Sequence, residues 1–104
     1  MDKTSALQDK ASDVSRVLAA LSNPRRLLIL CHLMQKGETP VSGLTSVTGL
    51  SQSALSQHLA LMRLEGLVKA RKEGLNVFYT IADKRIEALM ASLEQIFCPL
   101  EEVR

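Results

Sequence analysis

The chain has 104 residues, enough for a single domain spanning 1–104, and it lies near the lower limit of what can bury an adequate core alone. Hydrophobic residues make up 46% of it, but only two Phe and one Tyr are aromatic, so the core must consist of aliphatic side chains, which favours packed helices. No apolar run approaches the ~20 residues that cross a bilayer, and the N-terminal MDKTSALQDK lacks the order of a signal peptide. We therefore expect a cytosolic location and no membrane partner.

The charged residues are unevenly distributed, although the formal net charge is only +2. Residues 22–80 carry seven Lys or Arg against three Asp or Glu, whereas the two flanks together carry six against eight. So small a net charge does not by itself indicate a polyanionic partner. The distribution does place any basic surface in the central part of the chain.

The N-terminal region predicts one helix from Ala6 to Leu21. Apolar residues recur there with a four-three spacing that keeps them on one side of a helix, and charged residues occupy the other side. The apolar positions are Leu7, Ala11, Val14, Leu18 and Leu21.

A second helix is predicted from Pro24 to Lys36, after the capping residue Asn23 and with proline in the first turn, where helices tolerate it. Gly37 is expected to end it. This helix contains the segment LLILCHLM, so one of its sides should be deeply buried. The residues expected on that side are Leu27, Leu30, Cys31 and Met34.

Two further helices should follow in close succession. The first covers about Val41 to Thr48, with Leu44 and Val47 facing inward, and Gly49 stops it. Ser51 is a good N-cap for the next helix, whose buried stripe is expected at positions i, i+4 and i+7. Those positions are Leu55, Leu59 and Met62. Two helices joined by a short turn that contains glycine form a helix-turn-helix.

The C-terminal third predicts a hairpin and a last helix. Leu67–Lys72 and Val77–Ile81 are rich in residues that favour strands, and the segment EGLN between them has turn chemistry. Asp83 is expected to cap a final helix, which Pro99 would end. Its apolar stripe is Ile86, Leu89, Met90, Leu93, Ile96 and Phe97.

The predicted order is α-α-α-α-β-β-α, a mainly helical winged helix-turn-helix with a β-hairpin as the wing. The helices at about 6–21 and 84–98 each have a strong apolar stripe, and the winged helix-turn-helix between them can close its core without both stripes. They are therefore the expected dimerisation elements.

The helix after Ser51 is expected to contact DNA. With Leu55 at the centre of the buried face, a helical turn of about 100° per residue places Ser53, Ser56 and Gln57 outward and His58 at the flank. Such short polar side chains contact phosphates or base edges, and glutamine can pair with adenine in the major groove. The remaining expected DNA contacts are Ser51 and Gln52 at the positive end of the helix, Arg63, and Lys69, Arg71 and Lys72 on the hairpin. The alternative is an ordinary solvated helix beside a hairpin without function.

Three segments of the sequence resemble the ArsR/SmtB family of winged-helix repressors: LSNPRRLLILCHL, LSQSALSQHLALMRLEGLVKARKEG and VFYTI. The likeness spans about residues 14–98, and SQSALSQHL is its most specific part. It implies a homodimer, joined through its first and last helices, that binds an inverted-repeat operator in double-stranded DNA and leaves it on meeting an inducer. Carried over to this sequence, it implies that Ser53, Ser56 and Gln57 read DNA, with Arg71 and Lys72 in the wing.

The sequence departs from the metal-sensing members of that family. The segment VSGLTSV has no cysteine where arsenic sensors carry a CxC pair, and DKRIEALMASLEQIFC has no histidine. Zinc would lack its usual nitrogen and sulfur ligands in these helices. We therefore expect neither a metal site nor another cofactor.

Two cysteines remain, Cys31 and Cys98, and neither belongs to a CxxC or Cys/His cluster. The pair resembles the BigR/HlyU-like branch of the family, which implies sensing of persulfide (sulfane sulfur) or oxidants through two such thiols. Joining them would connect the last helix to the helix from Pro24 to Lys36, which lies beside the helix-turn-helix that begins at Val41 (the reading unit). Arg25 and Arg26 precede Cys31 by about one and a half turns and could favour its thiolate. The alternative is that Cys31 is a buried apolar residue and Cys98 is inert.

These observations predict a homodimeric repressor that is released from its operator when Cys31 and Cys98 are cross-linked. Three alternatives stay open. The chain could be an antirepressor that responds to peroxide, or an adaptor that uses its winged helix for protein contacts and whose cysteines are inert. A thiol enzyme is disfavoured, because no general base, general acid or anion-binding segment accompanies either cysteine in the sequence.

Overall fold

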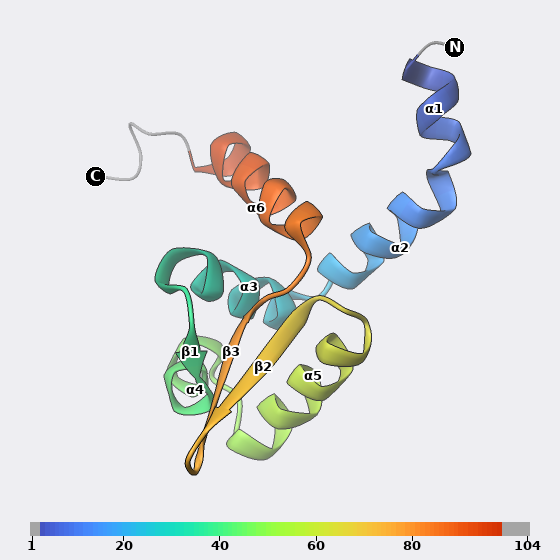
Figure 1. Ribbon diagram of the computed structural model, residues 1–104. Helices are drawn as coiled ribbons and strands as arrows, with labels where there is room; N and C mark the ends of the chain where they lie inside the picture. Colours follow the sequence, from blue (N-terminus) through green and yellow to red (C-terminus); the bar gives the residue numbers. More distant parts are fainter. Residues whose placement is uncertain (1–2, 99–104) are drawn as a thin grey trace.

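The computed structural model describes residues 3–98 and contains six helices and three strands in that range. It is mainly helical, with a three-stranded antiparallel sheet, two strands of which project from the helical body as a hairpin (Figure 1). The elements are α1 (Lys3–Asp9), α2 (Ala11–Leu21), α3 (Pro24–Lys36), β1 (Thr39–Pro40), α4 (Val41–Thr48), α5 (Gln52–Leu64), β2 (Val68–Glu73), β3 (Asn76–Ile81) and α6 (Lys84–Phe97). The winged helix-turn-helix architecture predicted from the sequence is confirmed.

Three helices begin at the predicted caps. The side chains of Asn23, Ser51 and Asp83 each accept a hydrogen bond from a backbone amide two or three residues later, at 2.8, 3.1 and 2.8 Å. These bonds satisfy amides that have no partner within the helix. Gly37 ends α3 as predicted, with φ at +74°. The expected end of α6 at Pro99 lies outside the described residues.

The sheet has the order β1-β3-β2. The hairpin β2–β3 turns at Gly74, whose φ of +62° suits glycine, and its strands pair from Val68 with Ile81 to Glu73 with Asn76. The short strand β1 was not predicted. It pairs with the middle of β3, and its two residues were too few to produce an alternating pattern.

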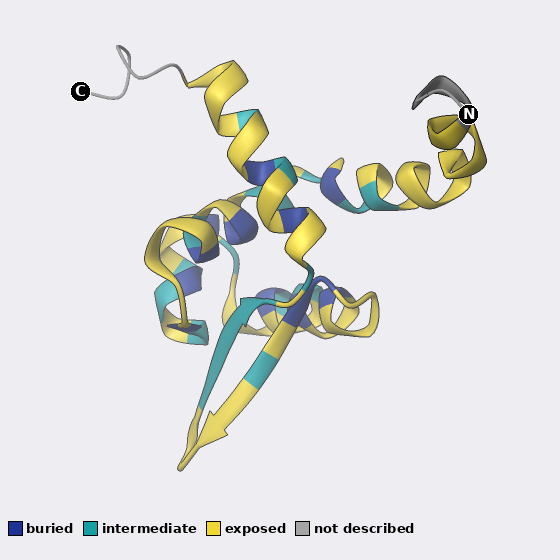
Figure 2. Cartoon of the chain, turned by 45° about the horizontal axis from the view of Figure 1, so that its top comes forward, coloured by how far each residue is buried: buried dark blue, intermediate teal, exposed yellow. Residues whose placement is uncertain are grey.

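The core lies between α3, α4, α5, the base of the hairpin and the first half of α6 (Figure 2). The predicted stripe of α5 is confirmed, since Leu55, Leu59 and Met62 are fully buried. The other buried apolar residues are Leu21, Ile29, Leu30, Leu33, Leu44, Leu67, Val68, Ile86 and Met90.

The predicted buried side of α3 is wrong in part. Leu30 is buried and Leu27 is partly buried, but Cys31 and Met34 are exposed, and Ile29 and Leu33 are buried instead. The central segment of the helix, Leu27 to Met34, is apolar at every position but His32, so periodicity could not decide which of its sides meets the helix-turn-helix. Val47 in α4 is likewise exposed rather than inward, and buried Thr48 takes its place. Thr48 is accommodated because its hydroxyl donates to the carbonyl of Leu44 at 2.9 Å.

The N-terminal arm is two helices rather than one. Its chain turns at Lys10, whose amide donates to the carbonyl of Leu7 at 3.0 Å, three residues back instead of four. The arm extends away from the body (Figure 1), so its apolar stripe has little to pack against in one chain. Leu7 is 60% exposed and Leu18 is 51% exposed, although Leu21 is buried at the junction with the body.

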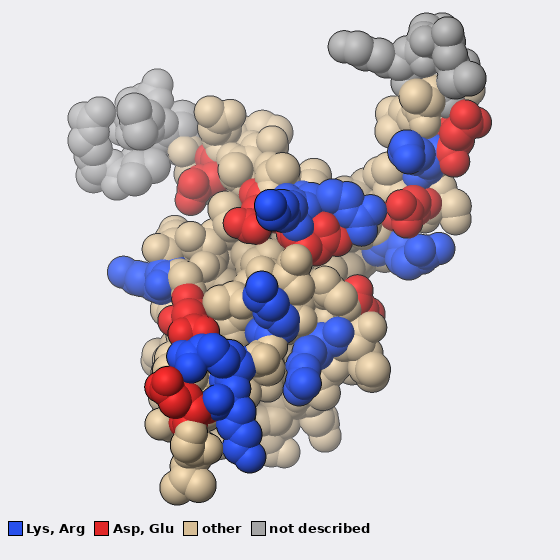
Figure 3. Space-filling model, viewed as in Figure 1, with Lys and Arg blue, Asp and Glu red and all other residues tan. Residues whose placement is uncertain are grey.

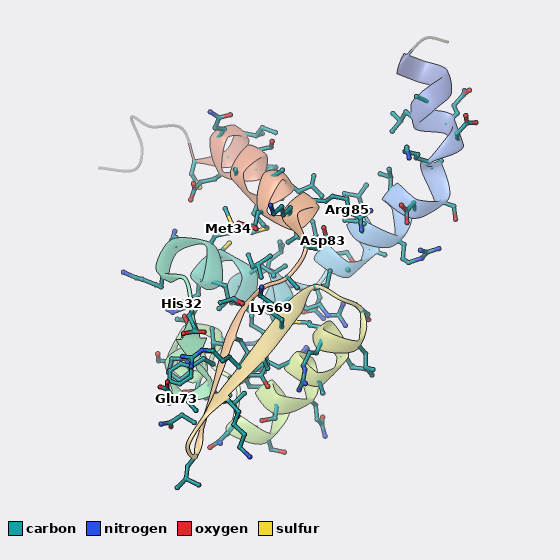
Figure 4. All side chains as sticks on the ribbon, viewed as in Figure 1. His32, Met34, Lys69, Glu73, Asp83 and Arg85 are labelled. Carbon is teal, nitrogen blue, oxygen red and sulfur yellow. The ribbon has the colours of Figure 1, made fainter. Side chains whose placement is uncertain are left out.

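The last turn of α6 is exposed as well. Ile96 is 66% exposed and Phe97 is 72% exposed, so only the first half of the predicted stripe enters the core. Arg85 near the start of α6 pairs with Asp83 at 2.8 Å (Figure 4). It also pairs with Asp13 at 3.3 Å, which links α6 to α2. Among the described helices, none is long and apolar enough to cross a membrane.

Candidate nucleic-acid interface and thiol site

The outer face of α5 is polar and accessible. Ser53, Ser56 and Gln57 are exposed on the side opposite the buried stripe, as predicted, and His58 is half-buried at the flank. Ser51 and Gln52 are exposed at the N-terminal end of the helix, where the hydroxyl of Ser51 caps the backbone. This face therefore offers hydrogen-bonding groups without charge, which suit base edges and phosphates.

The turn between α4 and α5 contains the predicted Gly49 and is held by Arg25 and Thr48, which were not predicted to act there. Gly49 adopts φ of +71°, and the guanidinium of Arg25 on α3 donates to the carbonyl of Thr48 just before it. The hydroxyl of Thr48 accepts from the amide of Leu50 at 3.2 Å. These bonds attach the turn to α3 and thereby set the direction in which α5 leaves it.

In the wing, Arg71 is engaged by protein groups. Its Nε and Nη2 each donate to Glu38 at 2.8 Å, and its Nη1 donates to Glu73 at 3.2 Å. The guanidinium carbon also lies 5.0 Å from the centre of the Phe78 ring. The hydrogen bonds from Arg71 lower the pKa of Glu38 below its ordinary value and, with those to Glu73, raise the pKa of Arg71. Arg71 is therefore a wing cation whose charge is already balanced.

Strand β1 explains this arrangement. Glu38 directly precedes β1, and β1 pairs with β3 so that Pro40 lies opposite Phe78. Phe78 lies opposite Arg71 of β2 on its other side, so Glu38 and Arg71 approach each other across β3. Because β1 was not predicted, the contact between Glu38 and Arg71 could not be predicted either.

The other predicted cations are available. Lys69, Lys72 and Arg63 are exposed, and within residues 3–98 none of the three takes part in an ion pair. Lys and Arg side chains gather on the face of the molecule that carries β2 (Figure 3), where Lys69 lies over the strand (Figure 4). The basic surface is thus supplied mainly by lysines.

The two thiols face one hollow between α3 and α6. Cys31 and Cys98 are unbonded and exposed, and both line a hollow of about 330 Å³. Its other lining residues are Leu27, Met34, Gln35, Met90, Leu93, Glu94 and Phe97. Met34 projects from α3 toward α6 (Figure 4). The interpretation of Cys31 as a buried apolar residue is therefore wrong.

The surroundings of Cys31 favour the thiol over the thiolate. Partial burial raises the pKa of Cys31 most, and the nearby charges of Glu94 and Cys98 raise it further. The expected help from two arginines is absent, because Arg25 binds the carbonyl of Thr48 and Arg26 pairs with Glu65 at 2.8 Å. In the described part of the chain, no group of three or more His, Cys, Asp or Glu side chains is placed to hold a metal ion.

A winged helix-turn-helix with a polar reading helix and a basic hairpin defines a DNA-binding regulator. The chain belongs to the family of bacterial regulatory proteins called the arsR family, whose model matches residues 23–70. It is 41% identical to the HTH-type transcriptional regulator YgaV of Escherichia coli, over 95% of this chain and 100% of that protein.

Solved structures agree with this assignment. The transcriptional repressor BigR of Xylella fastidiosa superposes with a TM-score of 0.86 and 32% identity, over 93% of this chain and 98% of that one. A homodimeric winged helix-turn-helix DNA-binding domain from Mycobacterium bovis gives a TM-score of 0.72 and 36% identity, over 100% of this chain and 93% of that one. The resemblance to the ArsR family and its BigR-like branch is thereby confirmed.

Proposed function

We propose that this chain is a homodimeric transcriptional repressor that binds an inverted-repeat operator while Cys31 and Cys98 are thiols and leaves it when they are cross-linked through sulfur. The observation that carries the proposal is that both thiols line one hollow, although they are 67 positions apart in the sequence. One wall of this hollow belongs to the helix that supports the reading unit and the other to the last helix.

The DNA-binding part is supported by the exposed groups on α5 and the wing. Ser53, Ser56 and Gln57 would read bases or contact phosphates, and Lys69 and Lys72 would contact the backbone. The hydroxyl of Ser51 accepts from the amide of Ala54, and the remaining amides of the first turn of α5 could bind a phosphate.

The homodimer is supported by the exposed apolar residues at both ends of the chain. Leu7 and Leu18 on the arm, with Ile96 and Phe97 on α6, are far more exposed than such side chains usually are in a monomer. The related Mycobacterium bovis domain is a homodimer, and the relative from Xylella is a repressor. Pairing two chains would also place two reading helices on half-sites ~34 Å apart.

The cross-link is chemically balanced with either class of inducer. Two thiols and one hydropersulfide RSSH give a disulfide, RSH and H₂S. Two thiols and two RSSH give a trisulfide bridge, two RSH and H₂S. Two thiols and a peroxide ROOH give a disulfide, ROH and water. Closing a loop between residues 31 and 98 is worth about 4 kcal/mol by the chain-entropy estimate, above the ~1–3 kcal/mol of typical allosteric coupling.

The test compares binding of the reduced and the cross-linked protein to the DNA upstream of its own gene. Fluorescence anisotropy should show tight binding by the reduced chain and a loss of at least about tenfold after persulfide treatment. The variants Cys31→Ser and Cys98→Ser should bind like the reduced chain and stay bound after treatment. Equal affinity of all forms would contradict the switch. Weak binding that is insensitive to salt would favour the protein adaptor, and a response to peroxide alone would favour the peroxide-responsive regulator.

A further inference from the structure

The hollow that contains Cys31 and Cys98 has a chemical character of its own. Its walls are mostly apolar, formed by Leu27, Met34, Met90, Leu93 and Phe97. At about 330 Å³ it is within the size range of sites that bind small molecules. Met34 is exposed at its rim and is not among the residues assigned above to the dimer contact, so a reagent can enter from solvent on that side.

The charge in this hollow is negative. Of the described residues that line it, Glu94 alone is charged, and no Lys or Arg is among them. Arg25 and Arg26, the cations that precede Cys31 on α3, are bound elsewhere. An anionic reagent would therefore lose hydration on entry and meet a carboxylate without gaining a cation.

We propose that the hollow between α3 and α6 selects neutral, apolar carriers of sulfane sulfur, such as dialkyl polysulfides, over anionic carriers. The alkyl groups would lie against the Leu, Met and Phe side chains while the sulfur chain reaches the two thiols. This inference rests on the proposed function, because it names the class of inducer for the same pair of cysteines. The raised pKa of Cys31 agrees with it, since the same burial and the same carboxylate that disfavour its thiolate also disfavour an incoming anion.

The reaction can be written with a dialkyl trisulfide, RSSSR. One thiolate of the chain attacks an outer sulfur and forms a mixed disulfide, with RSS⁻ leaving. The second thiolate attacks the protein-bound sulfur of that mixed disulfide, which gives the Cys31–Cys98 disulfide and releases RS⁻. The two protons lost by the cysteines end on the leaving groups, so the products besides the protein are RSH and RSSH. No other oxidant is required.

The test uses two reagents with the same three-sulfur centre, diallyl trisulfide, which is neutral, and the trisulfide of glutathione, which is anionic. Intact mass follows the rate at which the reduced full chain is cross-linked. The urea-unfolded chain serves as the reference, because it has the same thiols without the hollow. The ratio of the neutral rate to the anionic rate should be at least about tenfold larger in the folded chain.

Matched variants identify the cause. Glu94→Gln removes the charge in the hollow and should reduce the ratio about threefold or more, whereas Glu87→Gln, on α6 but not lining the hollow, should leave it unchanged. Equal ratios in the folded and unfolded chains would overturn the inference. Rates that fall as the protein concentration rises would overturn it too, because a second copy of the chain would then cover the hollow. If the ratio is as expected but cross-linking leaves DNA affinity unchanged, the proposed function fails and the selectivity stands.

Discussion

The ion pairs of the wing predict that its cations contribute unequally to DNA binding. Arg71 is already bound by Glu38 and Glu73, whereas Lys72 is exposed and has no ion pair in the part of the chain that is described. A cation that gives up a protein carboxylate to contact a phosphate exchanges one ion pair for another, and the carboxylate left behind attracts cations that offset part of the counterion release from DNA. Lys72→Ala should therefore reduce the salt dependence of binding much more than Arg71→Ala.

The size of the effect follows from counterion release. Each phosphate contact contributes about −0.9 to the slope of log K against log salt, so its loss changes the affinity ratio between 50 and 200 mM salt about 3.5-fold. In a homodimer two contacts are lost, and the change is about twelvefold. Lys72→Ala should thus reduce the steepness of the slope by about 1.8, and Arg71→Ala by clearly less.

Glu38→Gln provides the converse perturbation. It removes the partner that holds two nitrogens of Arg71 and leaves Glu73 on the third, so Arg71 becomes more available to a phosphate and the slope should steepen by up to about 1.8 per dimer. Because the pKa of Glu38 is lowered, the pair persists at neutral and mildly acidic pH, and the effect should not depend on pH there. Glu87→Gln is the control for loss of one negative charge.

The assay is a salt titration of binding to the DNA upstream of the chain's own gene, by anisotropy, for the reduced protein and each variant. An Arg71→Ala slope that falls as much as the Lys72→Ala slope, together with no effect of Glu38→Gln, would refute the unequal contribution of the two cations. That outcome would mean that Arg71 leaves Glu38 at no cost when DNA arrives.

Three further predictions concern stability and thiol reactivity. Leu59→Ala should lower the free energy of unfolding by about 2–5 kcal/mol in urea titrations, whereas Leu64→Ala, on the same helix but 84% exposed, should change it little. Gly43→Ala should destabilise by about 1–3 kcal/mol, because the added Cβ would lie 2.8 Å from Cγ2 of buried Thr39; stabilisation, the usual result of glycine to alanine within a helix, would contradict the packing. Alkylation of Cys31 by neutral iodoacetamide, followed by mass spectrometry, should be slower near neutral pH in the folded chain than in the urea-unfolded chain, because the pKa of Cys31 is raised in the fold. As the pH increases, the rate in the folded chain should still be rising at the pH where the rate in the unfolded chain levels off.

The reading unit could be predicted because its signals are local. Ser51 and Asp83 cap their helices through side chains that bond amides two or three residues away, so the starts of α5 and α6 are encoded within a few positions. Opposite the stripe of α5 in its first two turns lie the polar residues Ser53, Ser56 and Gln57, so the orientation that buries Leu55 turns them outward. The exposed positions of Ser53 and Gln57 follow from that orientation.

The features that were missed depend on contacts distant in sequence. The bond from Arg25 to the carbonyl of Thr48 spans 23 positions, and the pair between Glu38 and Arg71 spans 33. Neither spacing corresponds to a helical or strand period, so no pattern could indicate it. The break of the arm at Lys10 also has no glycine or proline to mark it.

The orientation of α3, which periodicity left ambiguous, bears directly on how a signal could reach DNA. Cys31 is two positions from Ile29 and from Leu33, or about 200° around the helix, so the thiol lies on the side opposite the residues buried beside the reading unit. The same helix holds the turn before α5 through Arg25. A cross-link to α6 would therefore act on a rigid element whose far side and first turn already support the reading helix. A small rotation of α3 would reach α5 through α4, which packs on both helices, and through the hydrogen bond at the turn, without any rearrangement inside the helix-turn-helix.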